Sequence, residues 1–139
     1  MSEIDYQALR EAAEKETKGR YIVGHASVNQ HGNLTGVFVC QKWKGDAGGV
    51  IAECYVNCLT ETGAQAYANA EFIAAFNPEV AMVLLDEREV KNRLIVELTM
   101  WIKRLSLSLK YANSLSSLPD QVMAHLNQNG LVSEEDVLR

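Results

Sequence analysis

Cysteine and histidine are the residues whose type and spacing could support chemistry in this chain. Cys54 and Cys58 are close in sequence, and Cys40, His25 and His31 lie upstream of them. Thiolate and imidazole are the ligands that zinc prefers. The surrounding residues favour a strand, however, where positions four apart are separated by about 13 Å, too far for both thiolates to bind one ion. We therefore interpret the cysteines as small buried side chains and expect neither a metal site nor a cofactor.

Two further patterns bear on catalysis and on phosphate binding. His25, His31 and His125 fall on a predicted strand, a loop and a late helix, with no recognisable nucleophile motif nearby. The glycine-rich segment 45–49 precedes a strand, whereas a phosphate-binding loop precedes a helix and usually contains a lysine and a hydroxyl residue. We interpret it as a hairpin loop. The sequence thus predicts a non-enzymatic protein without catalytic residues, with a small-molecule binder or small hydrolase as an alternative.

Composition limits the class of protein. The chain has 139 residues, of which 47% are hydrophobic and 22% charged, as is typical of a soluble globular protein. The net charge of -5 disfavours general affinity for nucleic acid or anionic membranes. The longest apolar run, residues 80–85, is far too short to span a bilayer. Three cysteines without a framework spacing, and a first segment unlike a signal peptide, predict a cytoplasmic protein.

The first part of the chain predicts a small α+β unit. Ser2 and Asp5 have capping-box spacing ahead of a short amphipathic helix, and Gly19 is a natural stop for it. Three segments rich in β-branched and aromatic residues follow, joined by short loops, and predict a three-stranded antiparallel meander. The predicted strands are residues 21–28, 36–43 and 50–58.

A helix is predicted to follow over residues 60–76, with alanines and one isoleucine on its packed side. These residues are Ala66, Ala70, Ile73 and Ala74. The stretch "AEFIAAFNPEVAMVLLDE" then interrupts the helical pattern with a proline. Asn77 is a strong N-cap residue and Pro78 suits the first turn of a helix, so we interpret this point as a corner between two helices.

The helix that begins at Pro78 has no clear stop before residues 113–117, and its continuity through residues 86–93 stays open at this stage. Apolar residues then recur at alternating spacings of three and four, which is typical of a helix–helix interface. The helix is too long to be covered by its own small head, so we predict a homo-oligomer with coiled-coil character. The predicted interface residues are Leu94, Leu98, Trp101, Ile102, Leu105, Leu109, Ala112 and Leu115.

Charge along the chain suggests how such helices would pair. Residues 61–90 contain six acids and one base, whereas residues 91–118 contain five bases and one acid. These halves attract each other in an antiparallel pair and repel in a parallel one. Lys103, Arg104 and Lys110 are weak candidates for nucleic-acid binding, which leaves a nucleic-acid-associated regulator as the first alternative function.

The last segment predicts a short helical tail. Pro119 opens a helix, Asn129 and Gly130 close it, and Leu131 is placed for the apolar contact of a Schellman motif. Ser133 and Asp136 again have capping-box spacing. We thus predict three parts: an α+β head over residues 1–77, a long oligomerisation helix over 78–116 and a helical tail over 117–139.

Three stretches of the chain resemble Ead-like proteins, which are encoded in the early accessory regions of lambdoid bacteriophages and prophages. They are "YQALREAAEKETKGRY", "AEFIAAFNPEVAMVLLDE" and "WIKRLSLSLKYANSLSSLPDQVMAHLNQNGLVSEEDVLR". The resemblance implies a phage accessory protein that acts in the cytoplasm of a bacterial host. It implies no catalytic residues, and an unknown host or phage protein as partner. The early-region setting suggests a bearing on host takeover or on the choice between lysis and lysogeny.

Overall fold

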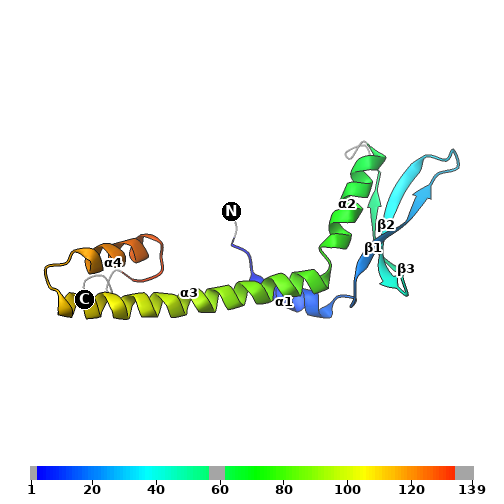
Figure 1. The fold of residues 1–139 in the computed structure, drawn as a ribbon. Helices are drawn as coiled ribbons and strands as arrows, with labels where there is room; N and C mark the ends of the chain where they lie inside the picture. The colour runs from blue at the N-terminus through cyan, green and yellow to red at the C-terminus, as the bar shows by residue number, and fades with distance from the viewer. Residues whose placement is uncertain (1–2, 57–61, 134–139) are drawn as a thin grey trace. The chain divides into compact units, whose positions relative to one another are not determined.

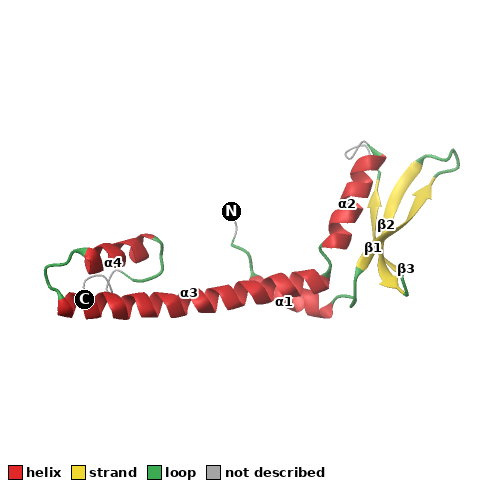
Figure 2. Ribbon diagram, viewed as in Figure 1, coloured by secondary structure: helices red, strands yellow, loops and turns green. Residues whose placement is uncertain are grey.

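The computed structural model describes residues 3–56 and 62–133, and in them it confirms the predicted α+β fold (Figure 1; Figure 2). A three-stranded antiparallel sheet is flanked by helices and followed by a long helix and a short one. The elements are α1 (Tyr6–Lys15), β1 (Tyr21–Val28), β2 (Leu34–Trp43), β3 (Asp46–Tyr55), α2 (Gly63–Ala75), α3 (Pro78–Ala112) and α4 (Leu118–Gln128). Internal contacts divide the chain into two compact units, Met1–Asp86 and Glu87–Arg139.

The sheet is a meander in the order β1-β2-β3. The β1–β2 loop is built on Asn29, whose side-chain oxygen accepts hydrogen bonds from the backbone N–H groups of His31 and Asn33, at 2.9 and 3.0 Å. The β2–β3 turn consists of Lys44 and Gly45, which have φ of 49° and 92°. Two residues in the left-handed region match the twist of the strands that a tight hairpin connects.

The prediction that residues 45–49 form a loop was wrong. Asp46 already pairs with Trp43, so β3 begins at Asp46. Residues 47–49, which were predicted to be in the loop, therefore belong to the strand. Glycine is used at Gly48 because the neighbouring strand approaches closely: a Cβ at this position would lie 2.9 Å from the carbonyl oxygen of Gln41. The predicted end of this strand, including Cys58, lies outside the described residues.

The core of the first unit lies between the sheet and α2. Tyr21, Val37 and Val39 from the strands pack against three alanines of α2, Ala66, Ala70 and Ala74. Small side chains at every fourth position allow the helix backbone to approach the sheet closely. Ile73 was predicted on this face but is 38% exposed, because it lies about 60° around the helix from Ala70, at the edge of the alanine stripe.

The first helix begins and ends inside its predicted limits. The capping box predicted at Ser2 was wrong, because Asp5 is the N-cap of α1. Its side chain accepts a hydrogen bond from the N–H of Ala8 at 2.9 Å, and the helix starts at Tyr6. It ends at Lys15, before Gly19, which instead has φ of 99° in the connection to β1. Arg10 holds α1 near the start of α3 through an ion pair to Asp86 at 2.8 Å.

The predicted corner between α2 and α3 is confirmed. Phe76 is the C-cap of α2, and Asn77 is buried between the two helices. Its side chain accepts a hydrogen bond from the N–H of Val80 at 3.1 Å and donates one to the carbonyl of Ala74 at 3.2 Å. One side chain thereby provides a hydrogen bond to a carbonyl at the end of α2 and to an N–H at the start of α3. Pro78 occupies the first turn of α3, where its missing N–H is not needed.

Helix α3 is continuous from Pro78 to Ala112, which answers the question left open about residues 86–93. In the second unit the chain turns after Ala112, and α4 runs back along α3, with Lys110 and Asp120 forming an ion pair at 3.5 Å. The Schellman motif at the end of α4 is confirmed. The N–H of Leu131 donates to the carbonyl of Leu126, and that of Gly130 to Asn127, both at 2.9 Å. The capping box expected at Ser133 involves residues that are not described.

Candidate interaction surface

In the second unit, α3 exposes many of its large apolar side chains. Leu94, Leu98 and Trp101 are 51%, 51% and 52% exposed, and Leu105 is 66% exposed. The buried residues of α3 in this unit include Thr99 and Ser106, which are polar. A helix that exposes its large apolar residues and buries small polar ones has its main apolar face free.

Four of the exposed apolar residues, Leu94, Leu98, Trp101 and Leu105, lie on one line along the helix, and this line with its extensions at both ends is called the seam. Positions three and four apart along a helix lie on one side of it, within an arc of about 100° here. The line continues upstream into two charged residues and downstream into two small ones. The seam comprises Glu87, Lys91, Leu94, Leu98, Trp101, Leu105, Ser108 and Ala112. Of these, Lys91 pairs with Glu87 at 3.8 Å within the same helix.

An apolar groove between α3 and α4 borders the seam. It has a volume of about 230 Å³. Its walls are almost entirely apolar, and Leu105 belongs to both the groove and the seam. The lining residues are Ile102, Leu105, Ser106, Leu109, Leu118, Pro119 and Val122. Helix α4 thus covers one flank of α3 without covering the seam itself.

The structure places most of the predicted interface residues together. Ile102 and Leu109 lie between the seam and α4, in the groove, and Ala112 is the last residue of α3. Leu115 does not continue the line: it lies beyond the helix, where its N–H donates to the side chain of Asn113, and it is 95% exposed. Sequence spacing alone did not identify Leu118 and Val122, because their proximity depends on the return of α4.

The basic candidates do not form one patch. Helical geometry puts Lys103 and Lys110 on the same side of α3 and Arg104 about 100° away from Lys103. Lys110 is paired with Asp120, as noted above. The guanidinium of Arg104 lies over the Trp101 ring, 5.3 Å from its centroid, at the edge of the seam. Each cation therefore has its own local environment.

The described cysteines and histidines fall on different elements of the fold. Cys40 is buried in β2 and Cys54 half-buried in β3, and both are free thiols. Across residues 3–56 and 62–133, no three side chains of histidine, cysteine, aspartate or glutamate are grouped so that they could hold a metal ion. His25 lies on β1 and His31 in the following loop, both exposed.

A hydrogen-bonded network on the sheet was not anticipated from the sequence. Ser27 donates to the carboxylate of Glu53 at 2.9 Å and accepts from Thr35 at 2.9 Å. A hydrogen bond from Tyr55 to Glu53, together with the carboxylate's charge, raises the pKa of that phenol. Gly36 leaves space for the carboxylate, since a Cβ there would collide with it. The network satisfies a half-buried charge, and no histidine takes part in the bonds named here.

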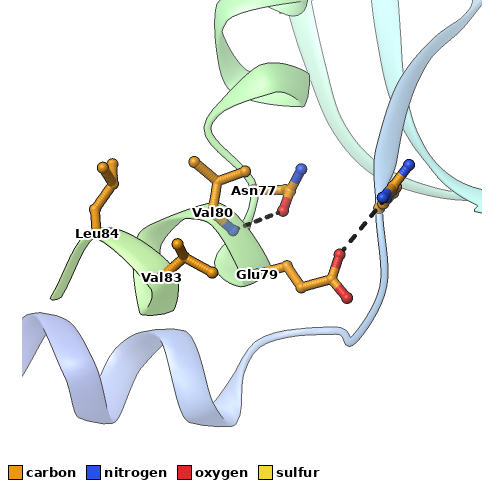
Figure 3. Close-up of a pocket in the computed structure, with 6 residues that line it drawn as sticks. Asn77, Glu79, Val80, Val83 and Leu84 are labelled. Carbon is orange, nitrogen blue, oxygen red and sulfur yellow. Dashed lines mark hydrogen bonds and ion pairs between the residues drawn. The ribbon is translucent and has the colours of Figure 1, made fainter. Parts of the chain in front are cut away.

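The corner between α2 and α3 carries an open concavity of about 490 Å³ (Figure 3). Its apolar wall is made by side chains of the first two turns of α3, and its rim by the ion pair between Arg20 and Glu79 at 3.8 Å. The lining residues are Arg20, Asn77, Glu79, Val80, Val83 and Leu84. Asn77 uses both ends of its amide in capping, so the concavity presents one exposed ion pair and aliphatic surface.

Comparison with known proteins gives a family. The model of the Ead/Ea22-like protein family matches residues 2–134. The chain belongs to this family. The Ead-like resemblance in the sequence is therefore confirmed, and the protein is phage-associated. No curated protein and no solved structure matches the chain significantly. Among the described residues of this Ead/Ea22-like chain, none of the helices combines the length and the hydropathy that crossing a membrane requires.

Proposed function

We propose that this chain is a non-enzymatic phage accessory protein that self-associates through the seam of α3 and acts by protein–protein interaction in the cytoplasm of the infected host. The observation that supports this most directly is the exposure of the seam. Four large apolar side chains in a row, each at least half exposed, are a surface that a second protein chain would cover.

The arrangement of the second unit favours a second chain as the cover. Among the described residues of this unit, α4 packs beside α3 on the flank that contains the buried Ser106. Burying a leucine or tryptophan side chain contributes about 1.5–3 kcal/mol, so each half-exposed seam residue still has roughly half of this to gain. The three-and-four spacing is the pattern of helices that pack against one another along their length.

Light scattering coupled to gel filtration tests the self-association. We expect an oligomeric mass at micromolar concentration, and a mass of one chain across that range would refute the proposal. Affinity capture from host lysate, with and without nuclease, then tests the mode of action. A host protein retained after nuclease supports protein–protein interaction, whereas loss of every captured protein supports a nucleic-acid-associated regulator instead.

The infection role follows from the phage association alone. We propose that the protein bears on host takeover or on the choice between lysis and lysogeny. Deleting its gene should change the fraction of infected cells that lyse, and an unchanged fraction across hosts and temperatures would contradict this part of the proposal.

A further inference from the structure

The two ends of the seam differ in the type of residue that forms them. Its centre is formed by four large apolar residues, its upstream end by Glu87 and Lys91, and its downstream end by Ser108 and Ala112. In a parallel pair each seam residue faces its own copy, so Glu87 would face Glu87 and Lys91 would face Lys91. Like charges at such positions repel, and polar seam residues are known to select orientation and register. In an antiparallel pair the charged end of one helix meets the small end of the other.

We propose that two copies pair through antiparallel α3 helices in one register, with Leu98 of each copy opposite Trp101 of the other. This inference rests on the self-association proposed above and specifies its geometry. The pair has two-fold symmetry, so every contact occurs twice. In this register Leu94 faces Leu105, and Lys91 faces Ser108. Large apolar residues meet large apolar residues, and the lysine meets a small hydroxyl side chain.

The residues beside the seam select the same register. Glu97 and Arg104 lie on one edge, each directly before a seam leucine. In the proposed register Glu97 of each copy faces Arg104 of the other, which gives two opposite-charge pairs. A shift by seven residues in one direction would bring Arg104 against Arg104, and a shift in the other direction would bring Glu97 against Glu97. On the other edge, Ile95 faces Ile102.

The groove beside α4 agrees with this register. The second copy places Leu94 against Leu105 and Ile95 against Ile102, and both receiving residues line the groove. Its volume of about 230 Å³ suits aliphatic side chains. Leu118, at the start of α4, is 53% exposed at the same groove and would close over the inserted residues. The seam residues, the charged residues at its edge and the groove are thus all consistent with the same antiparallel register.

Disulfide mapping in the full-length chain tests the arrangement. In a background with the three native cysteines replaced by alanine, Lys91→Cys and Ser108→Cys are made in separate chains, one of them tagged so that mixed dimers are resolved. A disulfide needs Cα atoms within about 7 Å. We expect mixing to give the Lys91→Cys/Ser108→Cys heterodimer, and neither variant alone to form a dimer. Val96→Cys, on the opposite side of the helix, is the matched control and should not cross-link.

The outcomes separate this inference from the proposed function. An oligomeric mass with Lys91→Cys cross-linking to itself would overturn the antiparallel orientation and leave self-association standing. An oligomer without the heterodimer would overturn the register, and a mass of one chain would overturn both proposals. As a second measurement, Glu97→Arg should weaken association about tenfold by setting arginine against Arg104. The swap Glu97→Arg with Arg104→Glu should recover most of that loss, and failure to recover would count against the register.

Discussion

Replacing Leu98 with alanine perturbs the centre of the seam with little effect on the single chain. Leu98 is 51% exposed, so about half of its apolar surface remains to be buried on association. Full burial of a leucine contributes about 1.5–3 kcal/mol, and the exposed half therefore about 0.75–1.5 kcal/mol per copy. Because the residue occurs twice in a dimer, the loss is about 1.5–3 kcal/mol. This corresponds to a dissociation constant roughly 10- to 150-fold higher.

Sedimentation equilibrium over a dilution series measures this change, and Val96→Ala is its control. Val96 is 63% exposed on the side of α3 opposite the seam, so its replacement should leave the dissociation constant nearly unchanged. Alanine is a strong helix former, so at concentrations where the chain is associated the helical signal in circular dichroism should be retained in both variants. Equal dissociation constants for Leu98→Ala and the unmodified chain, or equal weakening by both variants, would refute the assignment of the seam.

Three further predictions concern the first unit. Asn77→Ala removes the cap of α3 and should cost about 0.5–2 kcal/mol of stability, lowering the melting temperature by several degrees, whereas Asn77→Asp should lose less. Burial, helped by the nearby Glu16 carboxylate, raises the pKa of Tyr21 above its ordinary value of 10.0. The folded state therefore favours the neutral phenol, so urea titrations should show stability falling as pH rises above 10, and Tyr21→Phe should reduce that fall. Gly48→Ala should destabilise by about 1–3 kcal/mol in urea unfolding, because its Cβ would meet neighbouring backbone, whereas Gly49→Ala meets nothing and is the control.

The fold was predictable where local chemistry decides it. Asn77 and Pro78 mark the corner because a cap and a proline each restrict the backbone irrespective of distant contacts. The β2–β3 turn was misplaced for the opposite reason. Gly48 and Gly49 have no strand propensity of their own, and they lie in β3 because the residues on either side of them, Ala47 and Val50, pair with β2. Tertiary pairing, which one sequence segment does not contain, moved the start of that strand to Asp46.

The residues that form the line of the candidate surface were predictable from the sequence. The groove and the flank covered by α4, which border that line, were not. Spacing along the chain identified Leu94, Leu98, Trp101 and Leu105, because a helix places such positions on one side whatever it packs against. The flank that α4 covers depends on how the chain turns after Ala112. Neither the groove nor its lining by residues of α4 follows from periodicity.

The two units differ in what holds them together, and this difference argues that association is part of folding for the second. The first unit encloses Val37 and Val39 between a sheet and an alanine-lined helix, so it has an apolar core within one chain. In the second unit the buried side chains include the polar Thr99 and Ser106 as well as Leu126, while the leucines of the seam face outward. Helices gain most of their stability from packing an apolar face, and a helix whose face is open lacks that contribution. A second copy that covers the seam would supply it, and the stability of this unit would then rise with protein concentration while that of the first would not.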